Sequence, residues 1–159
     1  MKYKKVIFVG RRATCRDPMA MALLQREVPR YPVEVCARGL VVLFAEPMNP
    51  KAEEVLAANG IFLPDYRARQ LTSEDFSADT LVVTFHQNMK EKVLEMEGAQ
   101  NIVVLTDVTG DELEIMDPYG GELLQYEICL ETLGNSIRKL VQCLQNDSQN
   151  ETDEYGLIL

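Results

Sequence analysis

Three arginines stand close together near the start of the chain, in a pattern that suits anion binding. Arg11, Arg12 and Arg16 follow an apolar run at residues 6–9 and are followed by Asp17-Pro18. Aspartate then proline is typical of a helix with an N-cap and a first-turn proline. A strand, a short loop and a helix N-terminus direct backbone N–H groups and the positive end of the helix dipole to one point. The spacing therefore predicts an anion site in this loop.

The same segment resembles the phosphate-binding loop of the low-molecular-weight protein tyrosine phosphatases. Their signature is a cysteine, five residues and an arginine, typically followed by Ser-Pro-Met-Ala. Arg16 and the Pro-Met-Ala of residues 18–20 match this signature, which places Gly10 where the cysteine nucleophile belongs. No cysteine of the chain is followed six residues later by an arginine. Because glycine cannot form a covalent phosphoenzyme, the chain is predicted to be a degenerate member without the catalytic cysteine.

The resemblance covers residues 4–145. Residues 67–72 and 73–76 look like the middle of family members, and residues 117–121 resemble the family's acid loop. The resemblance implies an α/β fold, a three-layer sandwich with a four-stranded, mostly parallel sheet. We expect one domain over residues 1–145 and a polar, acidic C-terminal tail over residues 146–159.

The alternation of apolar runs with helical periodicity also indicates a parallel α/β sheet. The expected strands span residues 4–10, 33–37, 80–84 and 101–105. The expected helices span residues 17–27, 50–59, 87–95 and 120–144, with a further helical turn around residues 73–75.

Composition limits the function classes. The formal net charge of −9 argues against nucleic-acid binding, because most of the surface would repel a polyanion. No apolar run is long enough to span a bilayer. Four cysteines without metal or disulfide spacing indicate a reducing compartment, and the cytoplasm is the expected location. No cofactor or metal is implied, and the oligomeric state is not predicted.

The expected site has a loop and a rim. The anion-binding residues are Gly10, Arg11, Arg12, Ala13, Thr14, Cys15 and Arg16, and the rim residues are Tyr66 and Tyr119. Arg16 is expected to face the anion, with a structural ion pair to Asp17 or Asp117 as the alternative. Asp117 matches the family's general acid, but its Asp-Pro-Tyr-Gly context is equally a turn signal.

Several loop positions depart from the family. Arg12 and Ala13 replace a Gly-Asn pair, so the loop is either distorted or holds a negative φ at Arg12. Asp17 replaces a serine and is expected to act as the helix N-cap. Cys15 is expected to be a small packing residue, and His86, the single histidine, a surface or loop residue.

These observations predict a catalytically inactive homologue that binds a phosphate-like anion or a phosphorylated protein side chain. Two alternatives stay open. One is residual phosphatase activity through direct water attack, with Asp117 or Asp17 orienting the water. The other is an interaction scaffold with a vestigial pocket, for which Arg12 and Ala13 are the best sequence support.

Overall fold

The sheet has four strands, and all of them are parallel. A computed structural model describes residues 2–27 and 33–156, and side-chain surroundings as far as residue 146. The strands are β1 (Lys5–Gly10), β2 (Glu34–Gly39), β3 (Thr80–Thr84) and β4 (Ile102–Val104), in the order β2-β1-β3-β4. In register, Gly10 pairs with Gly39, and Val9 pairs with Thr84. Parallel pairing brings the carboxyl ends of the strands to one edge, where ligands bind in open α/β sheets.

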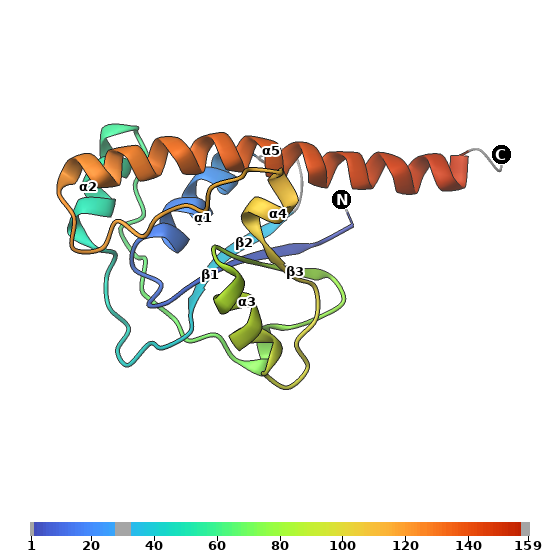
Figure 1. The fold of residues 1–159 in the computed structure, drawn as a ribbon, viewed down its shortest axis with the longest axis horizontal. Helices are drawn as coiled ribbons and strands as arrows, with labels where there is room; N and C mark the ends of the chain where they lie inside the picture. The colour runs from blue at the N-terminus through green and yellow to red at the C-terminus, as the bar shows by residue number, and fades with distance from the viewer. Residues whose placement is uncertain (1, 28–32, 157–159) are drawn as a thin grey trace.

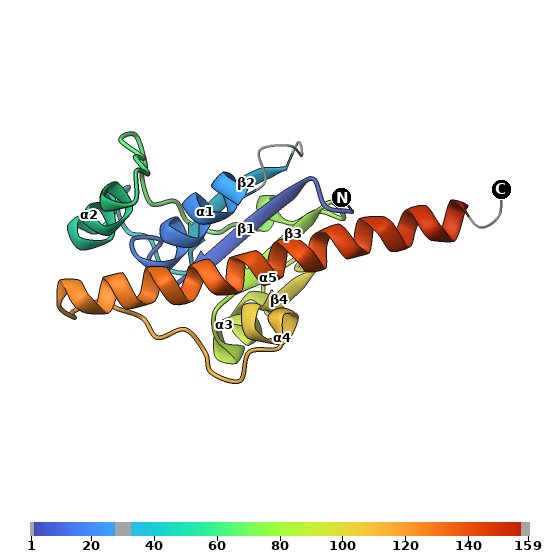
Figure 2. The ribbon, with the colours of Figure 1, turned by 90° about the horizontal axis from the view of Figure 1, so that it is seen from above.

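Helices cover both faces of the sheet (Figures 1 and 2). They are α1 (Arg16–Glu27), α2 (Pro50–Ala58), α3 (Gln87–Leu94), α4 (Leu105–Thr109) and α5 (Leu123–Gly156), with a 3₁₀ turn at Ser73–Asp75. Helices α1 and α5 pack together on one face, while α3 lies against β3 and β4 on the other. This arrangement confirms the predicted three-layer α/β sandwich.

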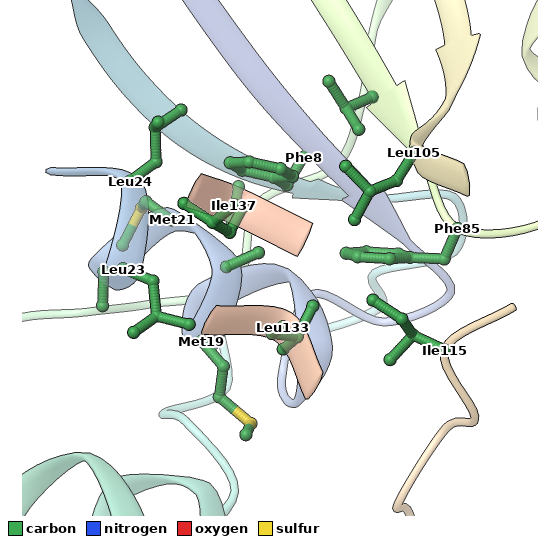
Figure 3. Close-up of a cluster of buried hydrophobic side chains, with 14 of the residues drawn as sticks. Phe8, Met19, Met21, Leu23, Leu24, Phe85, Leu105, Ile115, Leu133 and Ile137 are labelled. Carbon is green, nitrogen blue, oxygen red and sulfur yellow. The ribbon is translucent and has the colours of Figure 1, made fainter. Parts of the chain in front are cut away.

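The larger core lies between the sheet, α1 and α5. Phe8 of β1 stacks on Phe85 with ring centroids 6.3 Å apart, and Figure 3 shows Leu133 and Ile137 of α5 beside them. These four side chains are almost completely buried. The smaller core on the opposite face includes Val82, because successive strand residues point to opposite sides of the sheet.

A side-chain hydrogen bond, a proline and a glycine determine where α2 begins and ends. Asn49 accepts a hydrogen bond from the backbone N–H of Lys51 at 3.0 Å, and Pro50 is the first helical residue. Gly60 follows the helix with a φ of 75°, a left-handed conformation that glycine adopts without strain.

Several element boundaries differ from expectation, and the largest differences are in the helices. Helix α4 was not predicted, because five residues are too few to show a helical period. Helix α5 begins at Leu123 and continues to Gly156, beyond the expected end at residue 144, since neither proline nor glycine occurs between Gly134 and Gly156. The polar segment from residue 146 is therefore helical to Gly156, and the last three residues of the expected tail lie outside the described residues. Helix α1 begins at Arg16, one residue before the expected N-cap at Asp17.

Candidate functional site

The loop between β1 and α1 turns its carbonyl oxygens outward. The carbonyls of Gly10 and Arg11 accept hydrogen bonds from the N–H groups of Leu40 and Val41, each at 3.0 Å. The carbonyl of Thr14 accepts from the N–H of Asn49, also at 3.0 Å. In a planar trans peptide, the C=O of one residue and the N–H of the next point in opposite directions. The N–H groups of the following residues, Arg11, Arg12 and Cys15, therefore face the inside of the loop.

Tyr66 supports the loop from outside. Its hydroxyl donates to the carbonyl of Ala13 at 2.5 Å, and burial raises the pKa of this phenol. Tyr66 is not among the residues that line the site cavity, although the sequence placed it at the pocket rim. Its ring is large and partly apolar, and it packs against the core instead of standing at the mouth of the site.

The loop achieves its shape without glycine at residue 12. Ala13 adopts a φ of 60°, whereas Arg12 is not among the positive-φ residues of the described chain. Of the two expectations for this position, the negative φ at Arg12 is confirmed. Gly39 makes the close approach of β2 possible, because a Cβ there would lie 2.9 Å from the backbone carbon of Arg12.

A cavity of about 80 Å³ opens above the loop. Its walls come from the loop, the start of α1 and the segment before α5, and they comprise Arg11, Arg12, Thr14, Cys15, Arg16, Asp17, Asp117 and Tyr119. Arg11 and Arg12 are exposed, and the guanidinium of Arg12 lies 5.0 Å from the centre of the Tyr119 ring. This cation–π contact holds the Tyr119 ring against Arg12 in the wall of the cavity.

Arg16 is buried, with 3% of its surface exposed, and its two terminal nitrogens have different partners. Nη1 donates to Nε2 of His86 and to the carbonyl of Ile115, each at 2.6 Å. Nη2 lies 3.7 Å from Oδ2 of Asp117, which is longer than a hydrogen bond, so Nη2 keeps donor capacity toward the cavity. Arg16 thus forms an ion pair with Asp117 and also lines the cavity.

The contact of His86 with Arg16 was not predicted from the sequence. His86 follows β3, is half-buried, and holds Arg16 through Nε2 while its Nδ1 lies 2.5 Å from Oε2 of Glu114. Because arginine only donates, Nε2 must accept and Nδ1 must carry the proton. The expectation of a surface or loop residue was incomplete, since nothing local links residue 86 to residues 16 and 114.

Asp17 lies inside the site rather than at a helix cap. It is the second residue of α1 and is 4% exposed. Its Oδ1 and Oδ2 lie 2.4 and 2.8 Å from the position that a Cβ on Gly10 would take. The prediction that Asp17 caps the helix is wrong, because the carboxylate fills the space left by the missing side chain at residue 10.

Asp17 also has an unusual protonation equilibrium. Burial raises its pKa from 3.8 to about 7, against the opposing effects of its own backbone N–H, Arg16 and the Ala13 amide. Asp117 adds to the rise through charge repulsion. Of the side chains that the structure describes, Asp17 contributes the one buried polar atom without a hydrogen-bond partner, its Oδ2.

Cys15 and Asp117 occupy supporting positions. Cys15 is buried with its Sγ 3.7 Å from the hydroxyl of Tyr126, and burial raises its pKa, which disfavours the reactive thiolate. Asp117 accepts a hydrogen bond from the N–H of Tyr119 at 3.0 Å, which forms the turn that the sequence indicated. The described residues contain no group of three histidine, cysteine or acidic side chains placed to hold a metal ion.

Comparison with known proteins decides the family. The profile of the family described as low molecular weight phosphotyrosine protein phosphatase matches residues 5–150. The chain belongs to this phosphatase family. A probable low molecular weight protein-tyrosine-phosphatase, EpsP of Ralstonia nicotianae, is 32% identical over 123 residues, which cover 77% of this chain and 83% of EpsP.

Solved structures of the phosphatase family share the fold. The YwlE arginine phosphatase from Geobacillus stearothermophilus has a TM-score of 0.81 and 29% identity, and the match covers 92% of this chain and 96% of YwlE. A YwlE mutant with a phosphorylated active-site serine has a TM-score of 0.82 and 30% identity, with 91% and 98% of the two chains covered. No helix within residues 2–27 or 33–156 is both long and apolar enough to cross a membrane.

Proposed function

We propose that this member of the phosphatase family binds a phosphate group without hydrolysing it through a covalent intermediate. The observation that carries the proposal is the combination of an inward-facing set of loop amides with a glycine at residue 10. The amides and the guanidiniums around the cavity can bind an oxyanion through hydrogen bonds and opposite charge. Gly10 has no atom that can attack phosphorus, and the carboxylate of Asp17 fills the vacant space.

The ligand class follows from the walls of the site. The cavity of about 80 Å³ has room for little more than a phosphate group, while Tyr119 and Arg12 provide a stacked, exposed rim. These features fit a phosphorylated protein side chain that inserts its phosphate and leaves the rest of the partner outside. The relatives are named as tyrosine and arginine phosphatases, so either phosphorylated residue is a reasonable probe. The four free thiols support a reducing location, and we propose the cytoplasm.

Thermal unfolding with added anions tests the binding. Phosphate, sulfate, vanadate and phosphotyrosine are compared with chloride at equal ionic strength. A ligand present at 100 times its Kd adds about 2.7 kcal/mol of stability, a rise of several degrees in Tm. Arg12→Ala should reduce the rise because it removes an exposed guanidinium from the cavity. Arg67→Ala is the matched control, since Arg67 is exposed and does not line the cavity. No rise with any anion would contradict the proposal and favour a scaffold with a vestigial pocket.

Hydrolysis of p-nitrophenyl phosphate tests the chemistry. We expect no turnover by the natural sequence and none by Gly10→Cys alone, because a side chain at residue 10 collides with Asp17. Gly10→Cys combined with Asp17→Ser gives the Cys-x5-Arg-Ser signature without the collision and should produce turnover on the order of 100-fold or more above the detection limit of the assay. Measurable turnover by the natural sequence that falls in Asp117→Asn would instead support direct water attack with Asp117 as its orienting residue.

A further inference from the structure

Oδ2 of Asp17 is an unsatisfied polar atom at the floor of the site. The side chain is 96% buried and lines the cavity, and its Oδ2 has no hydrogen-bond partner within the described residues. Buried polar groups in folded proteins are almost always hydrogen-bonded. An oxygen that lacks a partner among the described residues, inside a cavity lined by guanidiniums, points to a ligand that supplies the partner.

A carboxyl in this position interacts with a bound anion in two opposite ways. The neutral form has an O–H that donates to an oxygen of phosphate or sulfate. The ionised form is acceptor-only, so it repels an oxyanion and takes the loop amides for itself. The backbone N–H groups of Asp17 and Ala13 already act on the carboxylate in this way. An external anion and an ionised Asp17 therefore compete for the same donors.

We propose that Asp17 couples oxyanion binding at this loop to the uptake of one proton. The inference rests on the proposed phosphate-binding function and adds the residue that controls it. In the unliganded site the carboxylate occupies the place of the missing nucleophile. When an oxyanion enters, Asp17 binds a proton from solvent and donates it as a hydrogen bond to the ligand.

Charged and titratable groups face Asp17 from the loop, from α1 and from the segment before α5. Arg11, Arg12 and Arg16 come from the loop and α1 and contribute positive charge. Asp117 faces Asp17 from the segment before α5, and its charge disfavours ionisation of Asp17. Cys15 and Tyr66 have raised pKa values and stay neutral near pH 7. His86 and Glu114 lie behind Arg16 and act on the cavity through it.

The protonation equilibrium of Asp17 supports the coupling between anion binding and proton uptake. Burial raises the pKa of Asp17 to about 7, so both forms of the carboxyl exist near neutral pH. A bound dianion raises this pKa further, because a like charge disfavours ionisation. Binding therefore weakens as the pH rises through and above about 7, by up to tenfold per pH unit when one proton is taken up.

Isothermal titration calorimetry with sodium sulfate tests the proposal on the full chain. Sulfate remains a dianion between pH 5.5 and 8.5, so any pH dependence of its Kd comes from the protein. At constant ionic strength, the Kd should be nearly constant below pH 6 and rise toward tenfold per unit above pH 7.5. Titrations in buffers of different ionisation enthalpy should show close to one proton taken up per sulfate at pH 8.

Asp17→Asn is the matched variant, because it keeps the shape of the side chain and cannot ionise. It should bind sulfate with a Kd that varies less than threefold over the same range, with no proton uptake. Asp17→Ser serves the same purpose if the asparagine variant does not fold, as judged by circular dichroism. Sulfate binding by the natural sequence without proton uptake, or uptake that persists in the variant, would overturn the inference and leave the proposed function intact. Absence of sulfate binding at every pH in both proteins would overturn the proposed function as well.

Discussion

Oδ1 of Asp17 lies 2.4 Å from the point where a side chain on Gly10 would begin. The two residues therefore exclude each other sterically: a carboxylate fits in the loop only because residue 10 has no Cβ. In the family signature the same two positions hold a cysteine and a serine. In this chain they hold Gly10 and Asp17, and the carboxylate of Asp17 occupies the space beside Gly10.

A double-mutant cycle measures this exclusion. Gly10→Ala should lower the free energy of unfolding by about 1–3 kcal/mol, because the new methyl overlaps the Asp17 carboxylate. In the Asp17→Ser background the same substitution should cost less, with a coupling energy of about 0.5–3 kcal/mol in urea unfolding. Gly134→Ala is the control, since the Cβ there meets its nearest atom at 3.7 Å and helix propensity favours alanine. Equal costs of Gly10→Ala in both backgrounds would contradict the steric relationship.

Stability should depend on pH through Asp17. Its folded pKa of about 7 exceeds the ordinary value of 3.8, so between these values the folded protein binds a proton that the unfolded chain does not. The free energy of unfolding should therefore fall as the pH rises from about 4 to about 7, by up to about 1.4 kcal/mol per unit. Above pH 7 this contribution is gone.

Urea unfolding between pH 4.5 and 8, in buffers without phosphate or sulfate, isolates this contribution. Asp17→Asn lacks the titrating group, so the difference in stability between the natural sequence and this variant should change over the range and level off above pH 7. Parallel pH profiles for the two proteins would show that Asp17 ionises normally.

The imidazole of His86 should hold its proton on Nδ1. Arg16 donates to Nε2, and Nδ1 faces the carboxylate of Glu114 at 2.5 Å, which fixes this tautomer. Because the chain has one histidine, a long-range ¹H–¹⁵N spectrum contains a single imidazole and needs no assignment. The expected spectrum at pH 7.5 has a protonated Nδ1 and an unprotonated Nε2. The reverse tautomer would mean that Arg16 is not held by His86. Glu114→Gln, which weakens the acceptor, should shift the population toward the other tautomer.

Ala13→Gly should have little effect on stability, although the residue is buried. Glycine relieves a left-handed φ that costs alanine about 1–2 kcal/mol. It also loses about 0.8 kcal/mol of methyl burial and increases unfolded-chain entropy by about 0.4–1 kcal/mol. These effects nearly cancel, so we expect a change within about 0.5 kcal/mol in urea unfolding.

Ala20→Gly is the matched control for residue 13. Ala20 is equally buried, but it lies within α1, where glycine relieves no strain. Helix propensity and the lost methyl together should cost about 1.5–2 kcal/mol. Similar losses for the two substitutions would show that Ala13 is not strained in the folded protein.

The sequence by itself determined the fold and predicted where a functional site lies. Apolar runs, turn residues such as Asn49 and Gly60, and the order of motifs predict a parallel α/β sheet, because these signals are local along the chain. The glycine at residue 10 and the arginine at residue 16 likewise predict an anion loop without a nucleophile.

Only the tertiary structure decided what the site's side chains do. The contact between Arg16 and His86 joins residues 70 positions apart, and that between Arg16 and Ile115 joins residues 99 apart. Tyr66 supports Ala13 across 53 residues. No periodicity or turn signal encodes such contacts, since they arise when separate elements pack at the same edge of the sheet.

Asp17 shows the difference most clearly. Its neighbours in the sequence indicate a helix cap, which is the local optimum for an aspartate before a proline. In the folded chain the carboxylate instead points toward Gly10, where space is available. There the loop amides and Arg16 partly offset the rise in pKa that burial causes. Burial, and hence the protonation state of this acid, is a property of the packed molecule and not of the order of its residues.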